Sequence, residues 1–584
     1  MILDTENKYY TQERNVQIVL SILKAHGIRR VVASPGSTNI AIVGSMQHDP
    51  FFEMYSCVDE RSAAYMACGL AAESGEPVVL SCTGATASRN YYPALTEAYY
   101  RKLPVLAITS SQDTRRLGHL KDQITDRSCP PKDVVNCSVC LQNIKDETDE
   151  WNVTINANRA VLELWHRGGG PSHINLETTY CRTFPVKELP PTKIIHRYTF
   201  EDQLPDLPKG KIAVVVGSHK KMGDRLTSAI DKFCQAYGAV VFSEHSSGYF
   251  GEYAINYTLA SCQSMPKENS GYEVLIHIGE VSGFVWQSGL PKEVWRVSED
   301  GELRDLYQRL SNVFEMPEAY FFEKYAEKQT QPVPSSLDAY KVSMEKVRSN
   351  FPQLPFSQIW ITSILHDAIP SGSVVHLGIL APIRSWNFFD IRRDITCDCN
   401  QGGFGIDGNV STLLGASQID KNKLYFCEIG DLSFFYDMNV LGSRHANNNL
   451  RILVVNNGLG CEFRLFNQVG NILGEETDKY ISAGGHYGNK SSDVIKQYVE
   501  SLGYEYMTAS SKDEFVSVYK RFVTPEITEK PMVFEVFTDV KDENDALAAM
   551  SKIIVQEPSM KDKLKGKIKQ IVGDEFIDSL KRLF

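Results

Sequence analysis

The chain has 584 residues, which is too long for one hydrophobic core and predicts two to four domains. Its composition, with 42% hydrophobic and 23% charged residues, is ordinary for a globular protein, and the net charge of −11 argues against a general affinity for nucleic acid or anionic membranes. No apolar stretch reaches bilayer length and the polar N-terminus lacks the pattern of a signal peptide, so we expect a cytoplasmic protein.

Short apolar runs that end in Gly, Ser, Asp or Asn recur along the chain, with segments of helix length between them. Continuous apolar strands that alternate with helices indicate parallel sheets covered on both faces. Ligands of such folds bind beyond the carboxyl ends of the strands, where these polar tips gather. In chain order the runs are RRVVASPGS, EPVVLSCTG, LPVLAITSS and SHINLE, then KIAVVVGS, AVVFSEHSS and VLIHIGE, and finally SVVHLG, LYFCEIGD, LRILVVNN and MVFEVFTD.

Two stretches rich in proline and charge, residues 184–197 and 327–340, are typical of linkers. They predict three α/β domains, each with a doubly wound parallel sheet, followed by a helical tail. The predicted boundaries are 1–185, 186–340, 341–550 and 551–584. Because acidic residues interrupt the basic face of this amphipathic tail, we expect it to dock on the protein's own surface rather than on a membrane.

The thirteen cysteines are scattered, apart from Cys137 and Cys140 in a CxxC and Cys397 and Cys399 in a CxC. A structural zinc site needs four ligands, usually from two nearby pairs, and these two pairs lie far apart in the chain. A redox role for Cys137 and Cys140 is an alternative with no further support in the sequence. The sequence therefore predicts buried, reduced thiols rather than disulfides.

The strongest candidate site lies in the last third of the chain, in EIGDLSFFYDMNVL followed by LRILVVNNGLG. One strand is predicted to end at Gly430 and Asp431, with a helix from about Ser433, and a second strand to end at Asn456 and Asn457. Adjacent parallel strands would bring the Asp431 carboxylate and the Asn457 amide oxygen to one sheet edge, where they would suit Mg²⁺. The helix N-terminus after Gly430 would offer N–H groups to a diphosphate. The alternative is a helix-capping Asp and an Asn-Asn-Gly turn.

The order and spacing of these residues resemble the Gly-Asp…Asn-Asn motif of thiamine-diphosphate enzymes. By this resemblance, Asp431, Asn457 and the main-chain carbonyl of Leu459 bind Mg²⁺. The cofactor also needs a carboxylate at N1′ of its aminopyrimidine ring, where protonation favours the tautomer that removes the thiazolium C2 proton. Glu60, between a predicted strand end and a small-residue helix in VDERSAAYMACGLA, fits that requirement, although an acidic residue at a helix N-terminus is common.

The longer pattern is similar to the thiamine-diphosphate decarboxylase and carboligase superfamily, and most of all to the succinyl-enolpyruvyl-hydroxycyclohexene-carboxylate synthases of menaquinone biosynthesis. The similar segments are SPGSTN, DERSAAYMACGLA, TGATASRNYYPALTEA, GPSHINLE, HLGILAPIRSWNFF, NQGGFGIDGNVSTLLGAS and GDLSFFYDMNVL. They cover roughly the first 180 residues and residues 355–545, whereas the middle domain matches only in position and α/β character. That domain lacks the G-x-G-x-x-G fingerprint, so we expect it to be structural rather than nucleotide-binding.

The resemblance implies roles for further residues. Ile406 in Gly-Ile-Asp would wedge the cofactor into a bent conformation, and without that context it would be an ordinary core isoleucine. Ser37 and Gln123 would line the substrate pocket, and Arg384 would hold a substrate carboxylate, the alternative for Arg384 being a surface ion pair. The residues implied to contact the cofactor are Glu60, Thr83, Ile406, Gly430, Asp431, Leu432, Ser433 and Asn457.

Two positions depart from the synthase pattern. Thr38 follows Pro-Gly-Ser where the synthases have arginine, and Gln401 stands where they have the arginine of Asn-Arg-Gly. Two guanidinium groups that would fork onto substrate carboxylates are therefore missing. We accordingly expect a relative with a changed substrate that carries fewer carboxylates.

The expected reaction is decarboxylation of a 2-oxo acid, followed by transfer of the acyl-anion equivalent to an unidentified acceptor. Release of an aldehyde after simple protonation is one alternative, for which His119 is either a proton donor or a solvated loop histidine. A non-catalytic binding protein is another, and the joint presence of Glu60, Asp431, Asn457 and Ile406 disfavours it. In the superfamily the glutamate and the metal-binding aspartate come from different subunits, so the resemblance implies a homodimer or a dimer of dimers.

Overall fold

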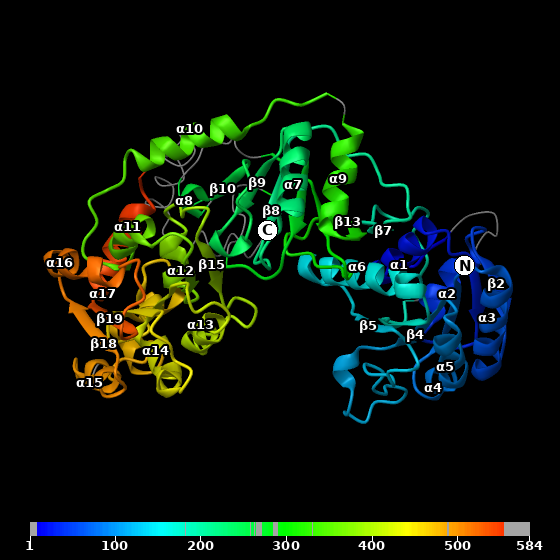
Figure 1. The fold of residues 1–584 in the computed structure, drawn as a ribbon. Coiled ribbons are helices and arrows are strands. Elements are labelled where there is room, and N and C mark those ends of the chain that lie inside the picture. The colour runs from blue at the N-terminus through cyan, green and yellow to red at the C-terminus, as the bar shows by residue number, and fades with distance from the viewer. Residues whose placement is uncertain are drawn as a thin grey trace, which may run out of the picture. The chain divides into compact units, whose positions relative to one another are not determined.

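The computed structural model describes residues 9–181, 183–256, 258–261, 263, 271–283, 290–329, 331–486 and 490–553. The chain separates into two compact units, the first made of residues 1–207 and 293–318 and the second of residues 208–292 and 319–584. Three parallel sheets with helices on their faces run through the chain (Figure 1), and the predicted fold class is confirmed. The three predicted domain boundaries stay predictions. All but the first three residues of the predicted tail 551–584 lie outside the described residues.

The first sheet belongs to the first unit and has the strand order β2-β1-β3-β4-β6-β5, all parallel. Its strands are β1 (Arg30–Ala33), β2 (Glu53–Ser56), β3 (Val78–Thr83), β4 (Val105–Ser111), β5 (Cys137–Leu141) and β6 (Ser172–Glu177). The helices that accompany the strands are α1 (Arg14–Ala25), which precedes β1, and α2 (Ile40–Gln47), α3 (Glu60–Ser74), α4 (Thr86–Asn90), α5 (Tyr92–Arg101) and α6 (Glu147–Leu162).

Side chains that alternate along the strands of this sheet pack into two separate hydrophobic cores, one on each face. Val31 and Val79 pack with residues of α1, α2 and α6, whereas Val32, Val78 and Leu80 pack with residues of α3 and α5. This is the burial on both faces that continuous apolar strands predict.

The middle sheet has the strand order β10-β9-β8-β11-β12-β13-β7. The second unit holds β8 (Ile212–Val216), β9 (Val240–Ser243), β10 (Ala254–Asn256) and β11 (Val274–Ile278), and the first unit holds β7 (His196–Thr199), β12 (Glu293–Val297) and β13 (Leu310–Glu315). The accompanying helices are α7 (Asp224–Tyr237), α8 (Thr258–Ser261), α9 (Glu318–Lys328) and α10 (Leu337–Arg348).

The carboxyl ends of β8 and β11 mark the point where this sheet reverses its winding, the usual ligand crevice of an open α/β sheet. Here the two strand ends are joined by backbone hydrogen bonds, from Gly217 N–H to the Ile278 carbonyl (2.9 Å) and from Glu280 N–H to the Ser218 carbonyl (2.7 Å). A Cβ on Gly217 would lie 2.2 Å from the Glu280 carbonyl oxygen. The backbone after β8 and the backbone after β11 therefore meet at the place where related sheets bind a nucleotide. The sequence lacks the G-x-G-x-x-G fingerprint of such a nucleotide site.

The third sheet belongs to the second unit and has the strand order β15-β14-β16-β17-β19-β18, again all parallel. Its strands are β14 (Val374–Leu377), β15 (Thr396–Cys399), β16 (Tyr425–Gly430), β17 (Leu450–Asn456), β18 (Glu505–Ala509) and β19 (Met532–Phe537). Its helices are α11 (Gln358–Ala368), α12 (Ala381–Trp386), α13 (Asn409–Ser417), α14 (Asp431–Asp437), α15 (Val494–Ser501), α16 (Lys512–Phe522) and α17 (Val540–Met550). Leu453 and Val455 pack on α11, α12 and α16, while Ile452 and Val454 pack on α13, α14 and α15.

The CxxC cysteines lie on strand β5, which separates them. Residues three apart on a strand point to opposite faces, so Cys137 and Cys140 form neither a redox pair nor half of a zinc site. All twelve described cysteines are free thiols, and burial raises the pKa of Cys137 to about 11. The prediction of reduced thiols is confirmed for these twelve.

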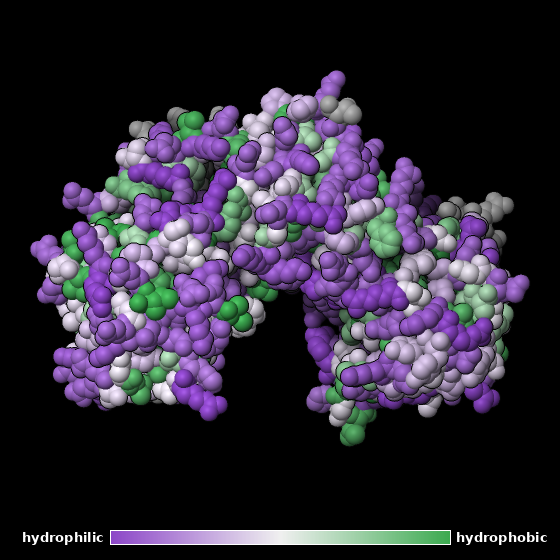
Figure 2. All heavy atoms as spheres, viewed as in Figure 1, coloured by the Kyte–Doolittle hydropathy of each residue, from purple (hydrophilic) through white to green (hydrophobic). Residues whose placement is uncertain are grey.

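Hydrophilic side chains predominate on the face shown in Figure 2, and hydrophobic ones are scattered among them. In the part of the chain that the structure describes, no helix combines the length and apolar character that a membrane span requires.

Replacing Gly217 with Ala should destabilise the middle domain, because the new methyl group would collide with the Glu280 backbone. We expect the free energy of unfolding to fall by about 2 kcal/mol or more, measured by thermal denaturation. Gly415→Ala is the control, since its Cβ would meet no atom within 4 Å and it lies within a helix. Equal stability of the two variants would contradict the close contact between the Gly217 and Glu280 backbones.

Candidate functional site

Strands β16 and β17 place two oxygen-bearing side chains at one edge of the third sheet. The parallel register pairs Gly430 with Val455, so Asp431 and Asn457 follow their strands at nearly the same level. Helix α14 begins at Asp431 itself, two residues before the predicted start at Ser433. The sequence motif thus occupies the strand ends that its spacing predicts.

Asp431 is 5% exposed, and burial raises the pKa of its carboxyl group to about 7. The nearby backbone N–H groups of Leu432, Asp431 and Asn457 stabilise the charged form of this carboxylate and oppose the shift of its pKa. The amide Oδ1 of Asn457 is buried without a hydrogen-bond partner. A buried carboxylate beside an orphaned amide oxygen is a donor set that a hard cation such as Mg²⁺ would satisfy.

The third predicted ligand is the carbonyl of Leu459, which accepts a hydrogen bond from Cys461 N–H (2.8 Å) and keeps a second lone pair. Among the described residues, no cluster of three or more His, Cys, Asp or Glu side chains could hold a metal. A metal site here would therefore combine one carboxylate, one amide and one main-chain oxygen. The residues present fit Mg²⁺ of the kind that carries a diphosphate.

A cavity of ≈ 480 Å³ opens beside this sheet edge, and we call it the diphosphate cavity after the group that it is predicted to bind. It is lined by Gly430, Asp431, Leu432, Ser433, Asn457, Leu459 and Ile406, all of them predicted site residues, together with Gly378–Pro382, Phe404–Asp407 and Gly460–Phe463. The structure therefore brings together on one cavity every residue that the sequence assigned to the diphosphate half of the site.

Ile406 is held in the cavity wall by a small polar clamp that sequence reasoning missed. Its carbonyl accepts hydrogen bonds from Asn409 Nδ2 (2.8 Å) and from Ser433 Oγ, and Asn409 Nδ2 also donates to Ser433 Oγ (3.0 Å). Asn409 Oδ1 is paired in turn with His376 Nε2 (3.3 Å). The Gly-Ile-Asp-Gly-Asn run carried the signal, since an Asn directly after a glycine at φ +75° can cap the loop that precedes it.

Arg384 lies on α12 and is already engaged. Its Nη1 and Nη2 donate to Oε1 and Oε2 of Glu462, each at 2.8 Å, and Gln468 Nε2 donates to the same carboxylate (2.8 Å). Glu462 lines the cavity and was not singled out from the sequence. The structure thus puts a protein carboxylate on the guanidinium that was predicted to hold a substrate carboxylate.

The residues predicted in the first unit gather at the carboxyl edge of the first sheet. Glu60 is the first residue of α3, after Asp59, whose side chain accepts a hydrogen bond from Ser62 N–H (2.8 Å). Burial raises the pKa of Cys82, on strand β3, to about 12; a hydrogen bond with Tyr91 opposes this rise and the negative charge of Glu60 adds to it. Glu60 therefore lies close enough to the end of β3 for its charge to act on Cys82. Thr83 ends that strand.

Ser37 follows Gly36, which packs against the side chain of Thr83. Any larger residue would collide there, because a Cβ on Gly36 would lie 2.0 Å from Thr83 Cγ2. Ser37 lines a separate cavity of ≈ 430 Å³ with Thr38, Thr178 and Tyr180. Gln123 is exposed in a loop at φ +60°. The structure therefore brings Ser37 close to Thr83 but leaves Gln123 outside that cavity's lining.

Thr38 and Gln401, which stand where the synthase pattern has arginines, form hydrogen bonds to other groups of the protein. Thr38, 3% exposed, donates to the Ser110 carbonyl (2.6 Å). Gln401, 1% exposed, donates to Glu244 Oε1 (3.0 Å) and Ser246 Oγ (2.8 Å) and accepts from Gly283 N–H (2.9 Å). Neither side chain offers a cationic group to a substrate.

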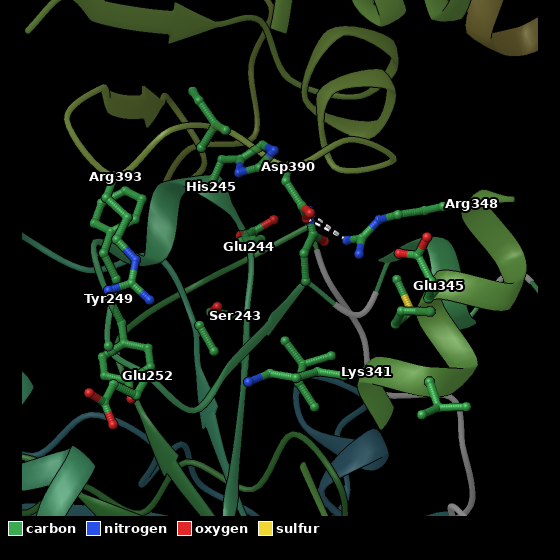
Figure 3. A pocket seen from close by; sticks show the side chains of 18 residues that line it. Ser243, Glu244, His245, Tyr249, Glu252, Lys341, Glu345, Arg348, Asp390 and Arg393 are labelled. Atoms are coloured by element: carbon green, nitrogen blue, oxygen red, sulfur yellow. Dashed lines mark hydrogen bonds and ion pairs between the residues drawn. The ribbon is translucent and has the colours of Figure 1, made fainter. Parts of the chain in front are cut away.

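A larger cavity of ≈ 700 Å³ lies in the second unit between the end of β9 and α10 (Figure 3). Arg348 of α10 pairs with Asp390 (2.6 Å), and Glu244 and His245 line the cavity near the strand end. His245 Nε2 is bonded to the carbonyls of Trp386 (2.8 Å) and Phe389 (2.9 Å). This cavity contains none of the predicted site residues.

Two buried glutamates lie behind the diphosphate cavity. Glu428 accepts from Gln358 Nε2 (2.9 Å) and Trp386 Nε1 (2.8 Å), and Glu543 accepts from Gln358 N–H (2.9 Å). Burial raises the pKa of each carboxyl group to about 7, and in Glu428 the charge of Glu543 adds to the rise. Since Gln358 lines the cavity and Trp386 belongs to α12, these carboxyl groups support the wall that carries Arg384.

The parallel α/β sheets and the Asp–Asn pair at adjacent strand ends fit the class of thiamine-diphosphate-dependent enzymes. Residues 14–128 match the family described as thiamine pyrophosphate enzyme, N-terminal TPP binding domain. Over 560 residues the chain is 32% identical to the 2-succinyl-5-enolpyruvyl-6-hydroxy-3-cyclohexene-1-carboxylate synthase of Bacteroides thetaiotaomicron, covering 91% of this chain and 97% of that one. The chain therefore belongs to this synthase family.

The synthase of the same name from Phocaeicola vulgatus is 30% identical over 571 residues, covering 92% of this chain and 98% of the relative. Among solved structures, the thiamine diphosphate-dependent 4-hydroxybenzoylformate decarboxylase of Rhodococcus jostii RHA1 covers 90% of this chain and 99% of its own, with 14% identity and a TM-score of 0.40.

Replacing Asn457 with Ala should remove a predicted metal ligand without disturbing a hydrogen bond of its side-chain oxygen, because that oxygen has no partner. We expect the affinity for thiamine diphosphate in the presence of Mg²⁺ to fall at least about tenfold, measured by calorimetry. Asn439→Ala, an exposed asparagine nearby, should bind as the unmodified protein does. Unchanged Mg²⁺ dependence in Asn457→Ala would rule out this ligand.

Glu428 should make stability fall with rising pH. Because its folded pKa of about 7 lies above the ordinary 4.5, the folded chain holds a proton that the unfolded chain has lost between these values. The free energy of unfolding should therefore decrease as pH rises through this window. Glu428→Gln should lose the part of the decrease that Glu428 contributes, which is worth up to roughly 3 kcal/mol, while Glu543 and Asp431, whose pKa values are raised likewise, keep theirs.

Chemical denaturation at pH 5 and pH 8 measures this difference. Glu526→Gln, at an exposed glutamate, is the control and should keep the pH dependence of the unmodified protein. Parallel pH profiles for Glu428→Gln and the unmodified protein would show that Glu428 is ionised throughout.

Proposed function

We propose that the protein is a carboligase that decarboxylates a 2-oxo acid and transfers the resulting acyl-anion equivalent to an acceptor. The observation that carries this proposal is the orphaned amide oxygen of Asn457 beside the buried carboxylate of Asp431, on a cavity that also holds Ile406. Membership of the synthase family supports it, since synthases join two molecules.

We assign the following roles to residues that line the cavity or support its wall. Asp431, Asn457 and the Leu459 carbonyl would hold Mg²⁺, while Leu432 and Ser433 lie where the diphosphate would reach the first turn of α14. Ile406, fixed by Asn409, would press on the cofactor from the opposite wall. Thiamine diphosphate, when bound, supplies the electron sink that makes loss of CO₂ feasible.

Glu60 is the proposed catalytic carboxylate, which would share a proton with N1′ of the aminopyrimidine. In the decarboxylation, the bond between the carboxylate and the carbonyl carbon breaks and its electron pair stays with the carbonyl carbon. That pair then forms the bond to the acceptor carbon. With Glu60, Thr83 is proposed to contact the cofactor, and Ser37 and Gln123 to meet the substrate.

We further propose that the substrate differs from that of the synthases that the chain resembles. Thr38 and Gln401 replace two arginines and are tied to internal partners, and Arg384 is paired with Glu462. A substrate rich in carboxylates would find few cationic partners here. The assembly proposed with this function is a homodimer or a dimer of dimers, as the superfamily resemblance implies.

The test supplies pyruvate and 2-oxoglutarate separately to protein loaded with thiamine diphosphate and Mg²⁺, and measures released CO₂. We expect turnover of a 2-oxo acid, and a loss of at least about 100-fold in Glu60→Gln because proton transfer is impaired. Glu73→Gln, an exposed glutamate on the same helix α3, is the matched control and should retain activity.

Aldehyde accumulation without added acceptor would favour simple decarboxylation over carboligation. Bound cofactor with no CO₂ from either acid would count against this donor class. Failure to bind the cofactor would overturn the proposal as a whole.

A further inference from the structure

The pair formed by Arg384 and Glu462 is bidentate, with both N···O distances at 2.8 Å. Such fork-to-fork pairing is the strongest arrangement available to these two side chains. The side chains are 23% and 12% exposed, so solvent screens the pair only in part. Gln468 adds a third donor to the same carboxylate. Glu462 is thereby held by three hydrogen bonds, two of them from Arg384.

Glu462, and not Arg384, belongs to the lining of the diphosphate cavity. The neighbouring residues Cys461 and Phe463 line it too, as do Ala381 and Pro382 from the start of α12. A molecule in the cavity therefore meets the carboxylate face of the ion pair, with the guanidinium behind it.

The supports of the pair hold it in this arrangement. On one side, Trp386 of α12 donates to the buried Glu428 (2.8 Å), and the following Asn387 donates to Glu244 (3.2 Å). On the other side, Arg464 of the segment that carries Glu462 pairs with Asp478 (2.6 Å). The elements on both sides of the pair are thus anchored, and Arg384 can meet a ligand in the cavity only if its two hydrogen bonds to Glu462 break.

A second carboxylate on the substrate would therefore be disfavoured twice. It would approach the like charge of Glu462, and if it displaced Glu462 from Arg384 it would leave a poorly solvated carboxylate without its partner. A substrate with an uncharged side chain meets neither obstacle.

We propose that Glu462 is a specificity-determining residue that masks Arg384 and restricts the donor to monocarboxylic 2-oxo acids. The proposal rests on the proposed function and names the substrate class for that site. Thr38 and Gln401 have no cationic group to offer, and Arg384 is held by the lining residue Glu462.

The test measures binding of pyruvate and of 2-oxoglutarate by calorimetry to protein loaded with thiamine diphosphate and Mg²⁺. All variants carry Glu60→Gln, so that bound acid is not consumed. In this background we expect pyruvate to bind more tightly. Adding Glu462→Gln should shift the affinity ratio toward 2-oxoglutarate by roughly 100-fold, because the like charge is removed and Arg384 is released.

The triple variant that also carries Arg384→Gln should lose this gain, because the cation that would hold the second carboxylate is gone. Glu475→Gln, an exposed glutamate on the neighbouring segment, is the matched control and should leave the ratio unchanged. Retained binding of thiamine diphosphate shows that each variant is folded.

An unchanged ratio in Glu462→Gln, tighter binding of 2-oxoglutarate without that substitution, or binding of neither acid would overturn the inference. Because the readout is binding, its failure is distinct from failure of the proposed function, which shows as absent CO₂ release by protein with Glu60 intact.

Discussion

The parallel backbone pairing of β16 with β17 is the interaction on which the site depends. It ties the ends of two neighbouring parallel strands, so their register fixes the separation of the two proposed metal ligands. The same strand end starts α14, whose Ser433 holds the carbonyl of Ile406. One backbone register thus positions the metal ligands, the diphosphate turn and the opposite wall of the cavity.

The arginines that the synthase pattern would use for an acidic substrate do not offer free charges in this protein. Two of them are replaced by other residues, and the third, Arg384, is paired with a protein carboxylate. Thr38 and Gln401 bond to backbone and polar groups within their own units, and Arg384 is neutralised by Glu462. Buried polar groups are stable only when their partners are complete, so each of these residues is locked to a structural neighbour. The cofactor half of the site and the substrate half have therefore diverged to different degrees from the synthase pattern.

The sequence predicted the parallel sheets and the residues of the diphosphate cavity because both follow from local patterns, namely apolar strands with polar tips and two short motifs. It did not predict Glu462 as the partner of Arg384, since the two lie on different segments and pair only through tertiary packing. Asn409 was overlooked for a different reason, because a helix-start asparagine has many local uses. The start of α14 was placed two residues late, since Asp431 is both cavity residue and first helical residue.

The hydrogen bonds of Gln401 bear on the direction in which such a protein can evolve. Its amide serves Glu244 and Ser246 as a donor and Gly283 as an acceptor. An arginine restored at this position could satisfy Glu244 but could not accept from Gly283, and the glutamate would capture its charge before any ligand arrived. Gln401→Arg alone would therefore not offer a free cation to a ligand, and a second substitution at Glu244 would be needed to release the charge.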